Sequence, residues 1–262
     1  MMDSIGPRDL QGLVEVLNGQ KVNKTFDREL AKHLQKIRLS HAITREFIRL
    51  GALKGLVKDG KGRTLIDLFA KFEVTKKVVY FDLDNASASM VDKCDELLAY
   101  YADNIRGETM SGVEVLVSSE FFGKFIQHPK VEKYWLQTEA AQALANRPRG
   151  RYGRSFEFQN ISFQEYRGFM PLRQANGSIV SARAIDAGKG HAYPTGTMNT
   201  FRTFDGPIHH IDHVNEVPES EIFISPKVLD HGEGVELKSQ SNALAIAKRP
   251  DLLVEVSAAA SA

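Results

Sequence analysis

The chain has 262 residues, of which 42% are hydrophobic and 26% charged, as in an ordinary soluble globular protein of one large or two modest domains. Its formal net charge of +1 gives no overall attraction to nucleic acid or anionic membrane. The single cysteine, Cys94, excludes an intrachain disulfide framework and a cysteine-based zinc site. No apolar run approaches the roughly 20 residues that span a bilayer, and the start does not read as a signal peptide, so we expect a cytoplasmic protein without a membrane partner.

The first half of the chain predicts a long helix followed by a mixture of helices and strands. Residues 1–24 predict an irregular lead-in, and apolar residues at helical spacing then predict a long helix over about 25–50, ended by Gly51 and Gly55. The pattern continues with a hairpin over 56–69, a strand over 74–83, a helix over 86–105 and a strand over 112–118. Ser118 or Ser119 caps a further helix, and a helical pattern resumes after Pro129.

From residue 155 the character changes to strands. Alternating apolar and polar residues on both sides of Gln159 and Asn160 predict a hairpin over 155–168. Further strands are predicted over 178–185, 221–225, 234–242 and 252–256, and the small-residue tail 257–262 is expected to be disordered. The chain therefore predicts an α+β fold.

Asp82 and Asp84 are the most enzyme-like residues, because they lie two apart at the end of an apolar run. This pattern resembles the opening of haloacid-dehalogenase-like phosphohydrolases, where the first aspartate attacks phosphorus and the second helps hold magnesium. That family also needs a second acidic pair, and neither Asp-Asp nor Gly-Asp occurs in this sequence. The favoured interpretation is a strand end and helix N-terminus made by Asp82, Asp84 and Asn85, with a magnesium-dependent phosphohydrolase as the alternative.

A second polar cluster contains His209, His210, Asp212 and His213, which are ligand types that zinc or nickel accepts. Their spacing suits neither one face of a helix nor the alternation of a strand. We therefore interpret the cluster as a histidine-rich surface loop and predict no metal site and no cofactor.

Two basic stretches are candidate contacts to other subunits or to DNA. Arg28, Lys32 and Lys36 form a stripe of residues four apart on the long helix. The second stretch lies in the loop before the predicted hairpin and contains Arg147, Arg149, Arg151 and Arg154. Residues 193–205 are a third candidate contact segment. No catalytic or dinucleotide-binding motif is present, so the sequence predicts a protein that is not an enzyme.

Several segments, in order, resemble the tailed-phage major capsid proteins of the lambda capsid-E type. They are FIRLGALKGLV, LFAKFEVT, SSEFFGKFIQHPKVEKYW, SFEFQNISFQEYRG, GHAYPTGTMNTFRTFDGP and GVELKSQSNALAIAKRPDLLVEV. The resemblance covers most of the chain from about residue 27 and implies the Hong Kong 97-type capsid fold. It implies a peripheral domain over 1–81 with the spine helix at about 25–50, an axial domain over about 82–215, and return strands over 216–262.

The function implied by this resemblance is structural. The chain would assemble with itself into pentamers, hexamers and an icosahedral phage head enclosing double-stranded DNA, with scaffold, decoration and portal proteins as further partners. Assembly would take place in the bacterial host cytoplasm. An encapsulin-like nanocompartment is a further alternative on the same fold.

Members of the family carry several dozen residues before the stretch that matches DSIGPRDLQG, which form an N-terminal arm and an extended loop. Here Met1 comes almost directly before that stretch, so we expect most of the arm and loop to be missing. Three explanations stay open: a shortened prophage copy, a truncated reading of a longer gene, or a shell protein that closes through other contacts.

Overall fold

The computed structural model describes residues 2–10, 14–17, 20–23, 26–59, 62–144, 153–173, 176–213, 216 and 221–260. The helices are α1 (Pro7–Leu10), α2 (Phe26–Lys54), α3 (Leu68–Phe72), α4 (Met90–Asn104), α5 (Ser119–Gln127) and α6 (Pro129–Leu144), with short 3-10 turns at Ile211–His213, Asp230–Gly232 and Pro250–Leu252. The strands of the first half are β1 (Met2–Ile5), β2 (Val14–Leu17), β3 (Gln20–Asn23), β4 (Leu56–Lys58), β5 (Thr64–Asp67), β6 (Lys77–Tyr80) and β7 (Gly112–Val117). Those of the second half are β8 (Ser155–Phe158), β9 (Ile161–Glu165), β10 (Phe169–Arg173), β11 (Ile179–Arg183), β12 (Lys189–Thr195), β13 (Phe201–Asp205), β14 (Phe223–Val228), β15 (Val235–Gln240), β16 (Ala243–Ala247) and β17 (Val254–Ser257).

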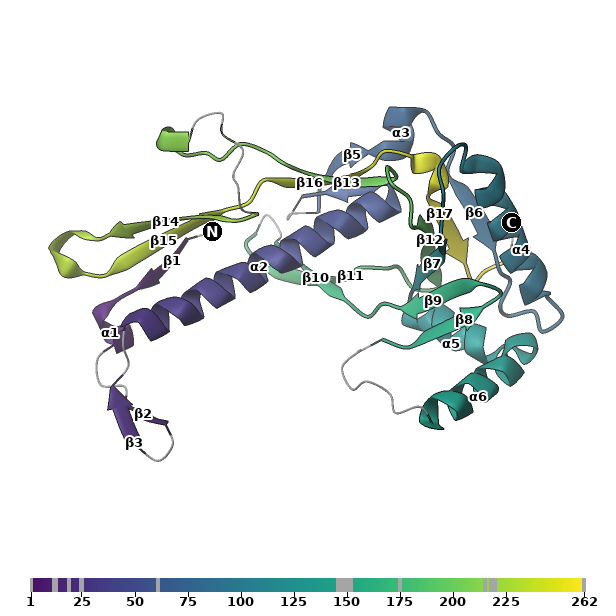
Figure 1. Ribbon diagram of the computed structural model, residues 1–262, viewed down its shortest axis with the longest axis horizontal. Helices are drawn as coiled ribbons and strands as arrows, with labels where there is room; N and C mark the ends of the chain where they lie inside the picture. The colour runs from purple at the N-terminus through teal and green to yellow at the C-terminus, as the bar shows by residue number, and fades with distance from the viewer. Residues whose placement is uncertain are drawn as a thin grey trace. The chain divides into compact units, whose positions relative to one another are not determined.

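The chain forms two compact units, one of residues 1–46 and 203–244 and the other of residues 47–202 and 245–262. The first boundary lies inside α2, which Figure 1 shows as one continuous helix. The predicted division into peripheral and axial domains at residues 82 and 215 stays a prediction.

The first unit is built on a three-stranded antiparallel sheet in the order β1-β15-β14 (Figure 1). Ile5 of β1, Ile37 of α2 and Leu237 of β15 form its buried core. The prediction that residues 1–24 are irregular was wrong, because β1, α1, β2 and β3 lie there. Met2 pairs with Lys238, so this strand depends on a partner more than 200 residues away that local patterns do not reveal.

Partly buried polar contacts attach α2 to other segments of the first unit. His33 Nδ1 lies 2.8 Å from Asp3 Oδ2. Arg45 is buried and donates to Asp205 Oδ1 of β13 at 2.8 Å, and its guanidinium also lies 3.2 Å from Glu221 Oε1. A buried guanidinium needs such acidic partners because its desolvation is otherwise costly.

The second unit contains a six-stranded mixed sheet in the order β6-β17-β12-β7-β9-β8. The pairs β17–β6 and β7–β9 are parallel, and the other neighbours are antiparallel. Successive side chains of a strand point to opposite faces. Along β7, Val113, Val115 and Val117 therefore join one hydrophobic cluster, whereas Leu116 packs against another.

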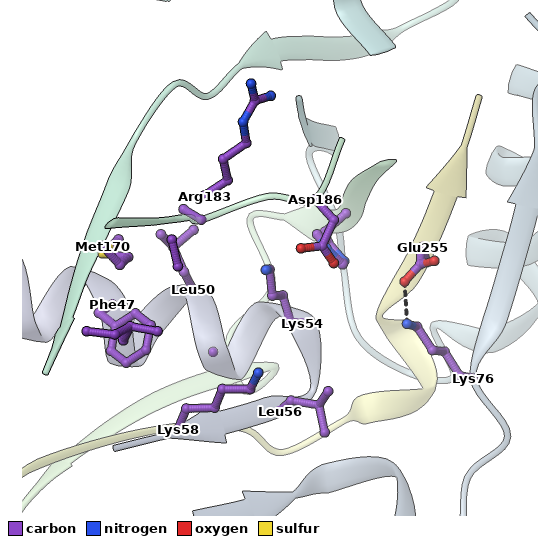
Figure 2. A pocket seen from close by; sticks show the side chains of 15 residues that line it. Phe47, Leu50, Lys54, Leu56, Lys58, Lys76, Met170, Arg183, Asp186 and Glu255 are labelled. Atoms are coloured by element: carbon purple, nitrogen blue, oxygen red, sulfur yellow. Dashed lines mark hydrogen bonds and ion pairs between the residues drawn. The ribbon is translucent and has the colours of Figure 1, made fainter. Parts of the chain in front are cut away.

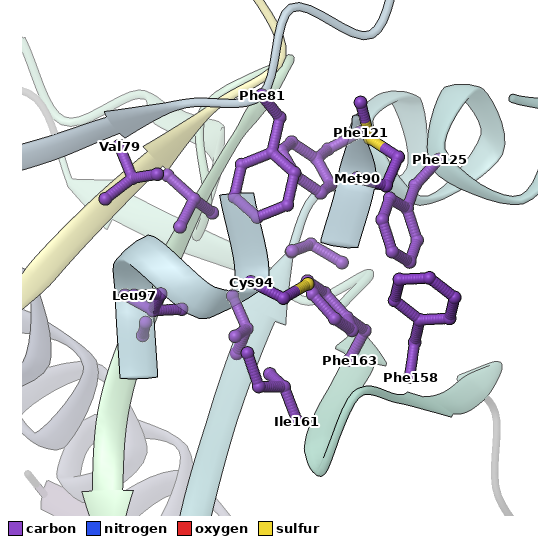
Figure 3. Close-up of a cluster of buried hydrophobic side chains, with 14 of the residues drawn as sticks. Val79, Phe81, Met90, Cys94, Leu97, Phe121, Phe125, Phe158, Ile161 and Phe163 are labelled. Atoms are coloured by element: carbon purple, nitrogen blue, oxygen red, sulfur yellow. The ribbon is translucent and has the colours of Figure 1, made fainter. Parts of the chain in front are cut away.

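The larger cluster is rich in aromatic side chains from the sheet, α4 and α5. Figure 3 shows Phe81, Phe121, Phe125 and Phe163 gathered beside Cys94. The ring centroids of Phe125 and Phe163 are 4.4 Å apart, and those of Phe81 and Phe121 are 5.5 Å apart in an edge-to-face arrangement. Such pairs stabilise the fold beyond their buried area by roughly 0.5–1.5 kcal/mol each.

The opposite face of this sheet contacts a smaller cluster. Its buried members are Leu50, Leu53, Leu68, Met170, Ala184, Ala247 and Leu253. Leu50 and Leu53 come from the last turns of α2, so the same helix supplies apolar residues to both units.

Several predicted element ends are confirmed and others are corrected. Residues 26–54 form the predicted long helix, but it continues through Gly51 and ends before Gly55, whose φ of 75° is the left-handed conformation that follows many helices. Ser118 caps α5, as predicted. The helix predicted from residue 86 begins at Met90, because Ser89 is its N-cap.

The hairpin predicted around Gln159 and Asn160 is confirmed as β8–β9. Both residues have positive φ, of 50° and 59°, as the turn of a tight two-residue hairpin requires.

We expect Phe163→Ala to lower the free energy of unfolding by about 3–5 kcal/mol, because it removes a fully buried ring from the aromatic cluster. Phe72→Ala is the matched control, since Phe72 is 46% exposed, and it should cost less than about 1 kcal/mol. Urea denaturation of both variants measures the difference. Equal losses would contradict this account of the core.

Candidate functional site

Asp82 and Asp84 lie between β6 and α4, after the strand end as expected. Asp82 has a φ of 51°, and its carboxylate accepts a hydrogen bond from Asn85 Nδ2 at 3.0 Å. Asp84 is largely exposed and forms an ion pair with Lys124 Nζ at 2.6 Å. Neither carboxylate caps α4, because Ser89 does, so the helix-terminus part of the interpretation was wrong. What these aspartates make is a local turn and a surface ion pair.

The histidine cluster lies in the connection between β13 and β14, which confirms the loop interpretation. His213 Nδ1 lies 2.7 Å from Glu216 Oε2, and the rings of His210 and His213 lie 5.3 and 5.1 Å from the ring of Phe223. Within the part of the chain that the structure describes, no group of three or more histidine, cysteine or acidic side chains is placed to hold a metal.

The basic stripe of α2 lies within the first unit. Lys32 Nζ contacts Glu29 Oε1 at 3.0 Å, and Lys36 Nζ lies 3.8 Å from Asp3 Oδ2. The side chains of Lys32 and Lys36 are 47% and 66% exposed, whereas Arg28 is half-buried. The two lysines thus remain accessible, but acidic residues of the same chain offset part of their charge.

Arg154, from the second basic stretch, holds a buried carboxylate. Its Nε donates to Glu165 Oε2 at 2.9 Å, its guanidinium lies 4.8 Å from the ring centre of Phe122, and Arg167 Nε donates to Glu165 Oε1 at 2.8 Å. Burial alone would raise the pKa of Glu165, but the hydrogen bonds from the two arginines lower it to about 2. Arg147, Arg149 and Arg151 lie outside the described residues.

The two-stranded ribbon of β10 and β11 carries exposed apolar side chains that lie outside the candidate contacts predicted from the sequence. The register places Phe169 opposite Arg183 and Met170 opposite Ala182. Met170 faces the buried cluster. Side chains alternate along a strand, so Phe169 and Pro171 point to the other face, and so does Ile179. Phe169 is 55% exposed and Ile179 is 69% exposed. The register places these two apolar side chains at opposite ends of the exposed face.

Comparisons with known proteins show the family of the chain. The sequence profile of the family described as phage major capsid protein E matches residues 2–258. The chain belongs to this phage major capsid family. It is 31% identical to the major capsid protein of Salmonella phage Felix O1, covering 98% of this chain and 75% of that protein. It is 32% identical to the major capsid protein of Pseudomonas phage KPP10, with the same coverage.

Solved structures show the same fold. A protein described as a capsid protein of an E. coli CFT073 prophage superposes with a TM-score of 0.59 at 14% identity, covering 98% of this chain and 76% of that one. The capsid of Ralstonia phage GP4 gives a TM-score of 0.55 at 11% identity, covering 98% and 72%. The fold is therefore the Hong Kong 97 type, and the resemblance found in the sequence is confirmed.

Family membership makes the function structural. As a phage major capsid protein, the chain is a subunit of the capsid shell, and the phosphohydrolase alternative is not favoured.

In the segment 193–205, Tyr193 is half-buried and donates to Glu114 Oε2 at 2.7 Å, whereas Met198 is almost fully exposed. The segment therefore offers both a structural and an accessible side chain.

We expect Glu165→Gln to lower the free energy of unfolding by up to about 3 kcal/mol at pH 7, because the carboxylate that both arginines contact loses its charge. A folded-state pKa of about 2, below the ordinary 4.5, gives stability that is present above about pH 4.5 and is lost as the pH falls toward about 2. The difference between the two proteins should therefore shrink at pH 3. Urea denaturation at both pH values measures it, and the exposed Glu157→Gln is the control.

Proposed function

We propose that this chain associates with itself into capsomers of five and six copies that close into an icosahedral phage head around double-stranded DNA. Its membership of the capsid family supports the proposal, together with the exposed ribbon of β10 and β11. Assembly would take place in the host cytoplasm, and scaffold, decoration and portal proteins are further proposed partners.

The exposed face of the ribbon is the proposed contact to a second copy. A two-stranded ribbon leaves backbone donors and acceptors unpaired on its outer edges, and Phe169 and Ile179 add apolar area beside them. Burying exposed apolar area stabilises an interface by roughly 25 cal/mol per Å² before the costs of association. Arg183 lies over the ring of Phe169, with its guanidinium 5.9 Å from the ring centre.

A purely structural role, without catalysis, is part of the proposal. The Asp82 and Asp84 carboxylates are occupied by Asn85 and Lys124, which supports a role in local structure. None of the described helices is long and apolar enough to cross a bilayer.

Ile179→Lys should weaken self-association at least about tenfold without lowering the melting temperature, because it places a charge in the proposed contact while the side chain is already exposed. Native mass measurements and negative-stain electron microscopy over a concentration series check this. Ala99→Lys, which adds the same charge at an exposed position of α4, is the control. If both variants assemble like the parent chain, the ribbon is not a subunit contact.

Contact of the α2 stripe with DNA should be non-specific and salt-sensitive. The double variant Lys32→Gln, Lys36→Gln should reduce the slope of log affinity against log salt by about 2 for duplex DNA, since each lost phosphate contact removes about 0.9. Fluorescence anisotropy with a random-sequence duplex measures the slope. The control is Lys71→Gln, Lys130→Gln, which removes two exposed lysines of the second unit, and an equal effect there would assign the binding to general charge.

A further inference from the structure

A pocket of about 230 Å³ lies within the second unit, against the face of the six-stranded sheet opposite the aromatic cluster. His191 of β12 and Glu255 of β17 are direct cross-strand neighbours on this face, and both line the pocket. Figure 2 shows Phe47, Leu50 and Met170 on one side and Lys54, Asp186, Lys76 and Glu255 on the other, with Lys58 and Arg183 near the apolar side chains. The pocket is thus amphipathic, lined by both apolar and charged side chains.

Cations outnumber anions in the lining by four to two. The two carboxylates are those of Asp186 and Glu255, and Glu255 is already paired with Lys76, shown dashed in Figure 2, and with Lys189 Nζ at 2.8 Å. Arg183 pairs with Glu120, outside the pocket. The remaining positive charge in the lining belongs to Lys54 and Lys58.

The amino groups of Lys54 and Lys58 lack an ion-pair partner among the described residues. No carboxylate lies within 4 Å of either amino group in the described part of the chain. Burial lowers the pKa of Lys54 most. Attraction to Asp186 and Glu255 raises it and repulsion from Lys58 and Lys76 lowers it, and the net shift is downward. The ammonium is therefore desolvated without an adequate counter-charge, which is unfavourable unless an anion is supplied.

His191 adds no charge to the pocket at pH 7. Burial and repulsion from Lys54 lower the pKa of His191 to about 4, so its ring is neutral at pH 7. Its Nε2 is buried without a hydrogen-bond partner among the described residues. The pocket thus combines unpaired ammonium groups with a neutral ring and too few acceptors.

We propose that this pocket binds a carboxylate joined to a short apolar group. The carboxylate contacts the amino groups of Lys54 and Lys58, and the apolar part lies against Phe47, Leu50 and Met170. The volume of about 230 Å³ admits a small group such as hexanoate. Either a free monocarboxylate or an acidic side chain beside an apolar one on a second copy carries this chemistry.

Titration of the full chain with hexanoate at constant ionic strength tests the site. The readout is the NMR signal of the Lys54 side chain in protein with ¹³C-labelled lysine, assigned from its loss in Lys54→Met. We expect a saturable shift with a rise in the pKa of Lys54. Acetate, which lacks the apolar chain, should bind at least about tenfold more weakly, and hexylammonium, which reverses the charge, should not bind.

The double variant Lys54→Met, Lys58→Met should weaken hexanoate binding at least about tenfold, followed through the Lys76 signal, while Lys71→Met, Lys130→Met leaves it unchanged. Unchanged melting temperatures exclude unfolding as the cause. The proposal is overturned if no saturable shift occurs up to about 50 mM hexanoate, or if hexylammonium produces the same shift.

The Lys54 NMR signal, measured without added ligand at several protein concentrations, distinguishes the two sources of the carboxylate. If a second copy supplies it, the Lys54 signal moves as the protein concentration is raised, and hexanoate opposes self-association. If a free monocarboxylate is the ligand, the signal is independent of protein concentration and hexanoate leaves the native mass unchanged.

Discussion

The centre of the six-stranded sheet depends on the absence of a side chain at Gly190. A Cβ at this position would lie 2.6 Å from Val117 Cγ1 and 2.8 Å from Val256 Cγ2, closer than real Cβ contacts allow. Because β12 has no side chain here, β7 and β17 keep their valines packed on the aromatic cluster on both sides of it. The next residue, His191, points to the opposite face. The strand β12 therefore contacts the aromatic core on one face and forms part of the pocket wall on the other.

Charge in the fold follows a consistent rule. The buried carboxylates Glu165 and Glu255 each have two cationic partners, and the buried Arg45 has two acidic ones. Paired charges of this kind hold neighbouring elements in one arrangement, and removing one partner leaves an uncompensated charge. The half-buried Lys54 and Lys58 have no such ion pair among the described residues, and this distinguishes the pocket from the structural ion pairs.

Elements with a strong local pattern were predictable from the sequence. The long helix, the strand β7 and the β8–β9 hairpin each follow from apolar spacing and turn residues within a short window. β12 was not predicted, because its sequence KGHAYPT contains glycine, histidine and proline, and its strand conformation depends on neighbours at residues 112–117 and 254–257. The pocket was unpredictable for the same reason, since it joins side chains from the end of α2, the β10–β11 ribbon and the sheet. Family resemblance, carried by ordered segments across the chain, identified the function where no catalytic pattern existed.

The single cysteine gives the second unit an internal reporter. Cys94 lies fully buried in the aromatic cluster, and burial raises the pKa of its thiol to about 12, so the reactive thiolate is almost absent while the core is closed. Alkylation of this chain therefore requires the cluster to open. The alkylation rate of the unaltered protein therefore reports how often the core opens. Measuring this rate in free subunits and in assembled particles compares the stability of this unit in the two states.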